Sequence, residues 1–119
     1  MLVDFAKHHP DNVGGIFEEF LRKDIRVRAF VFREPWFDIG SFEAYLEATR
    51  ALVGATVLKH GNVTMERSTG EGSVVLGEGS VVRNSTLHDV VMFGGCTVDD
   101  CQLHDCILDE GCVLKGVDL

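Results

Sequence analysis

Long apolar runs are absent from this 119-residue sequence. No stretch approaches the roughly 20 apolar residues that cross a membrane. The first residues, Met1 to Asp4, lack the basic and apolar regions of a secretory signal peptide. These absences predict a cytoplasmic protein with no membrane partner.

Basic residues are also scarce. There are 11 Lys and Arg against 19 Asp and Glu, so the formal net charge is -8 at pH 7. Because this charge disfavours contact with a phosphate backbone, nucleic acid is not an expected partner. The composition, with 45% hydrophobic and 25% charged residues, is that of a globular protein and excludes disordered and fibrous classes. The length allows one domain, or a piece of a larger protein.

Residues 1–54 alternate between helix-like and strand-like patterns, which predicts an α/β segment. Asp11 or Asn12 is expected to cap a first helix with apolar residues three and four positions apart. Alternating aliphatic residues predict a strand over 25–31. Ser41 is expected to cap a second helix that ends at Gly54. The apolar residues of the first helix are Ile16, Phe17, Phe20 and Leu21.

From Leu76 onward an internal repeat replaces the helix signals. Aliphatic residues follow one another at spacings of 6, 5 and 5, which sum to a period of 16. These residues are Leu76, Val82, Leu87, Met92, Val98, Leu103, Leu108, Leu114 and Leu119. A second set of small or medium residues keeps the same rhythm: Ser80, Ser85, Val90, Cys96, Cys101, Cys106, Cys112 and Val117.

Three aliphatic positions in each period predict a coil of three short strands, and stacked coils form a parallel β-helix. Both sets of side chains are expected inside it, with Gly, Asp, Glu and Asn at the corners. The rhythm fails between residues 60 and 75, where His60, Glu66 and Glu71 occupy slots expected to be apolar. Residues 55–75 are therefore expected to be a linker or an irregular first coil, and residues 76–119 the regular β-helix.

Two motifs resemble those of the sugar-1-phosphate nucleotidyltransferases, or NDP-sugar pyrophosphorylases. Trp36-Phe-Asp-Ile-Gly-Ser is similar to the Trp-x-Asp-Ile-Gly-Thr motif of that family, and Leu76-Gly-Glu-Gly-Ser-Val resembles the hexapeptide repeat of left-handed β-helices. In the family the first motif closes a Rossmann-like catalytic domain and precedes a helix and a β-helix. The resemblance implies an α+β chain: a partial Rossmann-like α/β segment followed by a short left-handed parallel β-helix.

The resemblance also implies a function, the C-terminal portion of an enzyme that converts a nucleoside triphosphate and a sugar-1-phosphate to an NDP-sugar and pyrophosphate. Mg²⁺ is the implied cofactor, with Asp38 as one of its two aspartate ligands, and Trp36 and Gly40 are implied pocket residues. The Gly-rich nucleotide-binding loop and the other aspartate are missing from this sequence, so the chain alone is predicted to be inactive. The β-helix is expected to mediate oligomerisation or regulation in a homo-oligomer. The nucleotide and the sugar stay open.

The sequence leaves two other functions open. A hexapeptide acyltransferase would use a catalytic histidine, for which His60, His88 and His104 are the candidates, although no extended loop interrupts the coils. The second alternative is a non-catalytic structural β-helix. His88 and His104 are one period apart and each precedes an aspartate, so they are expected to stack at one outer edge.

The cysteines follow the same period. Cys96 and Cys112 are one period apart and are expected to lie on adjacent coils. Small cysteine side chains fill tight interior positions well, and cytosolic thiols stay reduced. We therefore expect buried thiols here, and neither a disulfide nor a zinc site.

Overall fold

The computed structural model describes residues 14–119. The chain divides into two compact units, residues 1–35 and residues 36–119, and each is described by itself. Within the described part of the chain, no helix is long and apolar enough to cross a membrane.

The first unit contains helix α2, Gly15–Arg22. Its N-cap is Gly14, which has no side chain to accept a capping hydrogen bond, and the expected caps Asp11 and Asn12 lie outside the described residues. The apolar residues recur as predicted, but no residue of α2 is buried. Ile16 and Phe20 are half-buried, whereas Phe17 and Leu21 are exposed, so the apolar stripe of α2 is only partly covered.

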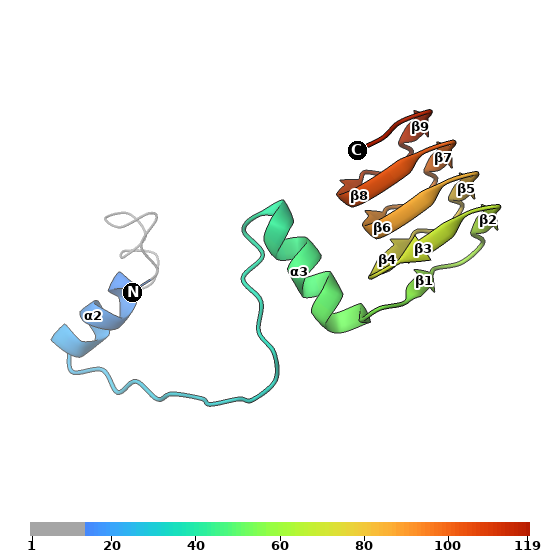
Figure 1. The fold of residues 1–119 in the computed structure, drawn as a ribbon. Helices are drawn as coiled ribbons and strands as arrows, with labels where there is room; N and C mark the ends of the chain where they lie inside the picture. Colours follow the sequence, from blue (N-terminus) through green and yellow to red (C-terminus); the bar gives the residue numbers. More distant parts are fainter. Residues whose placement is uncertain (1–13) are drawn as a thin grey trace. The chain divides into compact units, whose positions relative to one another are not determined.

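The strand predicted over 25–31 is wrong for this structure. These residues form a connection without strand pairing (Figure 1). Between residues 26 and 32, no backbone group makes a hydrogen bond to the backbone of another described residue. Phe30 and Val31 are 87% and 84% exposed. A strand needs a neighbour to pair with, and residues 14–54 supply none, so a Rossmann-like segment is not seen.

The second unit begins with the predicted second helix, α3, Phe42–Val53. Ser41 has an extended backbone, and its Oγ accepts a hydrogen bond from the Ala44 N–H at 3.1 Å. Gly54 ends the helix with a φ of 71°, a positive value that glycine adopts without a Cβ clash. Both predicted caps are confirmed.

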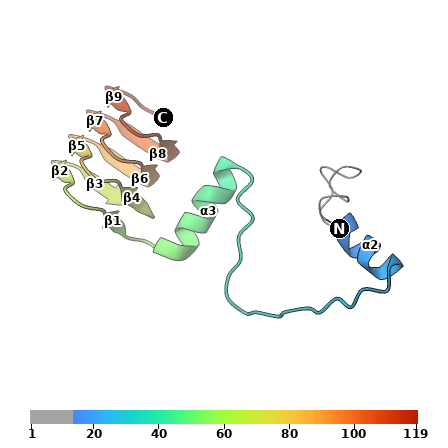
Figure 2. The same ribbon diagram turned by 180° about the vertical axis from the view of Figure 1, so that it is seen from behind.

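After α3 the chain forms a left-handed β-helix of about four turns (Figures 1 and 2). Every strand pair in it is parallel. The strands are β1 (Val57–Lys59), β2 (Thr64–Glu66), β3 (Thr69–Glu71), β4 (Val74–Leu76), β5 (Val81–Arg83), β6 (Thr86–Met92), β7 (Thr97–Asp99), β8 (Gln102–Leu108) and β9 (Val113–Lys115). The β-helix prediction is thus confirmed.

The two repeating sets of residues form the interior. Seven of the nine aliphatic positions are buried, from Leu76 to Leu108. Leu114 is half-buried and Leu119 is 61% exposed, so the expectation of a buried side chain is wrong for Leu119. Both lie on the last coil, on which no other described coil stacks. Of the second set, Ser80, Ser85, Val90, Cys96 and Cys101 are buried.

The first coil is one residue longer than the coils that follow it. Met65 pairs with Val82 and Gly70 with Leu87, whereas Leu87 pairs with Leu103. The extra residue lies at the corner between β3 and β4, because Glu71 pairs with His88 but Val75 pairs with Val91. A strict period of 16 therefore assigned the interior slots between positions 60 and 75 to the wrong side chains.

The corners use backbone conformations with positive φ. Glycine accounts for many of them, and Asp and Asn are the side chains that tolerate this region best. The corner residues fall in three columns: Gly61, Gly79, Gly95 and Gly111; Arg67, Asn84, Asp100 and Gly116; and Gly72, Asp89 and Asp105. Asp, Asn and Gly corners are confirmed, but no Glu has this conformation among the described residues.

Candidate functional site

The sequence Trp36–Ser41 leads directly into α3. Asp38 is exposed, and its carbonyl oxygen accepts a hydrogen bond from the Gly40 N–H at 3.2 Å. The next residue, Ser41, caps the helix. The order of motif, helix and β-helix that the resemblance implies is thus present in the structure, with the Asp38 carboxylate open to solvent.

Trp36 and Gly40, the implied pocket residues, are both exposed. The Trp36 side chain is 71% exposed and does not lie in a core made by the described residues. A Cβ added at Gly40 would meet no atom within 4 Å, and Gly40 does not have a positive φ. Gly40 does line a hollow of about 320 Å³ that is otherwise formed by Ile39, Ser41, Phe42 and Tyr45.

Helix α3 covers one outer face of the β-helix. The outward column Leu58, Val75 and Val91 is apolar, and the inner side of α3, including Ala48, packs toward it. Val91 is 4% exposed and Ala48 is 3% exposed. A hollow of about 270 Å³ remains between the helix and this column. Burial of these apolar side chains stabilises the contact between α3 and the β-helix.

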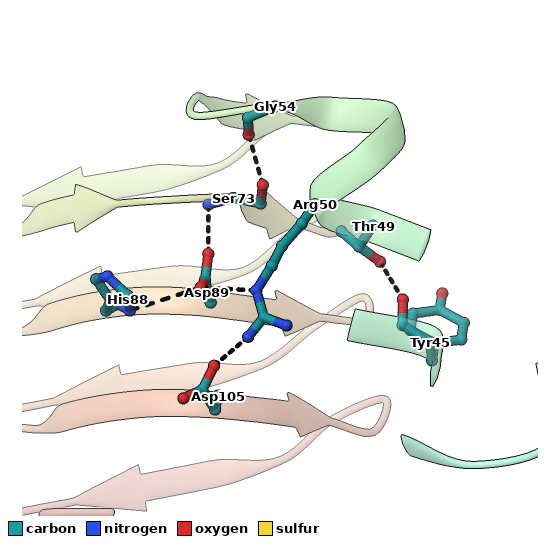
Figure 3. A network of polar contacts seen from close by, with 8 residues as sticks. All are labelled: Tyr45, Thr49, Arg50, Gly54, Ser73, His88, Asp89 and Asp105. Carbon is teal, nitrogen blue, oxygen red and sulfur yellow. Dashed lines mark hydrogen bonds and ion pairs between the residues drawn. The ribbon is translucent and has the colours of Figure 1, made fainter. Parts of the chain in front are cut away.

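Arg50 fixes α3 to a corner of the β-helix (Figure 3). Its Nε donates to Asp89 Oδ2 at 2.8 Å, and its Nη2 donates to Asp105 Oδ1. The Ser73 N–H donates to Asp89 Oδ1 at 2.7 Å, and Ser73 Oγ donates to the Gly54 carbonyl at 2.5 Å. One guanidinium therefore joins the helix to two successive coils.

The Asp89 carboxylate accepts hydrogen bonds from both the Ser73 N–H and the Arg50 guanidinium. Its side chain is 13% exposed. The Ser73 N–H and, second, the Arg50 guanidinium stabilise its charged form, and they hold its pKa below the usual value for aspartate. Ser73 belongs to the corner that contains the extra residue of the first coil. Asp89, on the next coil, thus contacts both the wider corner at Ser73 and helix α3 at Arg50.

Sequence reasoning missed Arg50 as a structural cation. Asp89 and Asp105 are one period apart and share one corner column, which places two carboxylates on successive coils. Like charges stacked in this way favour a cation between them. The repeat of two His-Asp pairs was the available signal, because it places two carboxylates at one edge and no basic side chain in the same column.

The described residues contain no group of three or more His, Cys, Asp or Glu side chains that could hold a metal ion. Mg²⁺ is held by one or two carboxylates together with waters and substrate phosphates. Asp38, the carboxylate that the resemblance implies as a ligand, belongs to no such group among residues 14–119.

The candidate histidines separate into a pair and a single residue. His88 and His104 are register partners on β6 and β8, and their ring centroids are 5.7 Å apart. His60 is exposed and follows β1. All four cysteines are free, with Cys96 and Cys101 buried and Cys106 and Cys112 partly buried.

Comparisons with protein-family models, with curated proteins and with solved structures find no match for this chain.

Proposed function

We propose that this chain is the C-terminal portion of a cytoplasmic sugar-1-phosphate nucleotidyltransferase. The observation that carries the proposal is the order of parts: the Trp36–Ser41 motif precedes the N-terminus of α3, and α3 leads straight into a parallel β-helix. The reaction joins a nucleoside triphosphate to a sugar-1-phosphate and releases pyrophosphate.

The uncovered segment before the motif supports the proposal. Residues 26–32 have no backbone hydrogen-bond partner among the described residues, and their side chains alternate in chemical type. One alternate set is aliphatic and the other combines arginine with phenylalanine. The aliphatic set is Val27, Ala29 and Val31, and the other set is Arg26, Arg28, Phe30 and Phe32. We infer that this segment is a strand of a catalytic sheet whose other strands lie outside residues 14–119.

Asp38 has a definite role in this proposal. It supplies one carboxylate ligand to Mg²⁺, and the other carboxylate comes from residues outside the described part of the chain. Bound Mg²⁺ neutralises charge on the phosphates during the transfer. The exposed Asp38 carboxylate, close in sequence to the exposed Trp36 ring, fits a position that a catalytic domain covers. Trp36 and Gly40 then line the substrate side of that pocket.

The β-helix has a separate role, the assembly of a homo-oligomer. Two large apolar side chains on its surface support this assignment: Phe93 is 44% exposed and Val113 is 72% exposed. A monomer mass by light scattering, for the product of the complete reading frame at micromolar concentration, would remove this part of the proposal.

Pyrophosphate release tests the activity. The product of the complete reading frame that contains residues 1–119 is supplied with each nucleoside triphosphate and with glucose-, mannose- or N-acetylglucosamine-1-phosphate. We expect turnover with one combination, and loss of nearly all of it in Asp38→Asn. Asp24→Asn is the matched control, because Asp24 is also exposed and its φ of 53° suits asparagine. No turnover with any combination, or an Asp38→Asn enzyme as active as the control, would overturn the proposal.

A further inference from the structure

The outer face of the β-helix carries two histidines in direct register. His88 and His104 are parallel partners on β6 and β8. Their neighbours Leu87 and Leu103 are fully buried, so the alternation of a strand turns both imidazoles outward. The His88 side chain is 42% exposed and His104 is exposed, so both rings are accessible from solvent.

The separation of the two rings suits a shared metal ion. Their centroids are 5.7 Å apart with an interplanar angle of 38°. Two imidazoles bound at about 2.0–2.1 Å to one tetrahedral ion place their ring centres roughly 5 Å apart. A small rotation of each side chain closes the difference, and the exposed face leaves room for it.

A carboxylate lies close to one of the two rings. Asp89 Oδ2 lies 3.7 Å from His88 Nδ1. The Asp89 carboxylate is itself held by the Ser73 N–H and by Arg50, so its position is fixed. Metal-binding histidines commonly have a carboxylate close to the ring nitrogen that does not bind the metal. The same order, histidine before a corner aspartate, recurs at His104 and Asp105.

We propose that His88 and His104 form a binding site for a divalent transition-metal ion that prefers imidazole ligands, of the class of Zn²⁺, Ni²⁺ and Cu²⁺. The described residues offer no third ligand. Water, or a group from another molecule, therefore completes the coordination. Such a site binds reversibly and is separate from the magnesium site proposed at Asp38.

The test is a Zn²⁺ titration of the wild-type protein, followed by calorimetry and by the ¹⁵N resonances of the imidazoles. We expect one ion per chain and a shift of the Nε2 signals of His88 and His104. Either His88→Ala or His104→Ala should weaken binding by about tenfold or more. His60→Ala is the matched control, since His60 is an exposed histidine outside the pair, and it should bind Zn²⁺ as the wild type does.

Two results would overturn this proposal. One is equal Zn²⁺ affinity in the wild type and both variants of the pair. The other is binding that leaves the two imidazole signals unchanged, which would place the ion elsewhere in the chain, for example at the adjacent His8 and His9 or at the thiols of Cys106 and Cys112. Because both histidines point outward, the circular dichroism spectra of the variants should match that of the wild type.

Discussion

Four leucines in the repeat allow the β-helix core to be tested with a single type of substitution. Leu87 and Leu103 are fully buried, Leu114 is half-buried and Leu119 is 61% exposed. Leu→Ala removes about three methylene equivalents, which is roughly 2.4 kcal/mol of transfer free energy at about 0.8 kcal/mol each. A cavity term adds to this where the surroundings cannot collapse, and the measured range is about 2–5 kcal/mol.

The expected loss of unfolding free energy therefore decreases from the buried coils toward the C-terminus. Leu103→Ala should cost about 3–4 kcal/mol, because the parallel hydrogen bonds of β6 and β8 keep the cavity walls apart. Leu114→Ala should cost about 1 kcal/mol, and Leu119→Ala under about 0.5 kcal/mol.

Urea unfolding followed by circular dichroism measures these losses. With a slope near 1.5 kcal/mol per molar urea, Leu103→Ala should lower the midpoint by roughly 2 M. A Leu103→Ala midpoint within experimental error of the Leu119→Ala midpoint would refute the interior assignment, because the two substitutions differ only in burial.

Three further predictions concern single side chains. Asp89→Asn should lower the unfolding free energy by about 1–2 kcal/mol at pH 7. The folded pKa of Asp89 is depressed, so its contribution to stability is present above the unfolded pKa of about 3.9 and is lost as pH falls through the folded pKa. Urea denaturation of the wild type and of Asp89→Asn should therefore show a smaller difference in unfolding free energy in acid than at pH 7. Ser41→Ala should cost about 0.5–2 kcal/mol through the lost cap of α3, measured by thermal unfolding, and Ser41→Asp should restore most of it. A thiol reagent at pH 7 should label Cys112 before Cys96, because Cys96 is buried and burial raises its pKa; equal labelling rates by mass spectrometry would contradict the burial assigned here.

The regular coils were predictable because their signal is local and repeats. Each coil from Leu76 onward places its aliphatic residues at the same spacing, so stacking follows from the sequence alone. The caps of α3 were predictable for a similar reason, since Ser41 and Gly54 act within one turn of the helix.

The first coil was not predictable from the period. Its extra residue at the corner before Val74 shifts every interior position by one. The carboxylate of Asp89, which is 16 residues after Ser73, accepts a hydrogen bond from the Ser73 N–H at this wider corner. The Arg50 contacts are still less local, because Arg50 is 39 residues from Asp89 and 55 from Asp105. Contacts of this kind depend on which face α3 covers, and a linear spacing does not contain that information.

The segment 25–31 shows the opposite failure. Its alternation correctly marks residues that suit a strand, but pairing requires a neighbouring strand, and the described residues contain none for it. Trp36, which the resemblance implies as a pocket residue, is likewise 71% exposed among the described residues. A local pattern indicates what a segment is suited to, whereas its partner determines what it forms.

Amide hydrogen exchange over residues 26–32 tests the central claim, that this segment is a strand of a catalytic sheet. The measurement compares residues 1–119 alone with the product of the complete reading frame. We predict rapid exchange of the Val27 and Val31 amides in the isolated chain, where they have no hydrogen-bond acceptor among the described residues, and strong protection in the complete product. Rapid exchange in both proteins would contradict the account, because a strand inside a sheet cannot leave its amides unpaired.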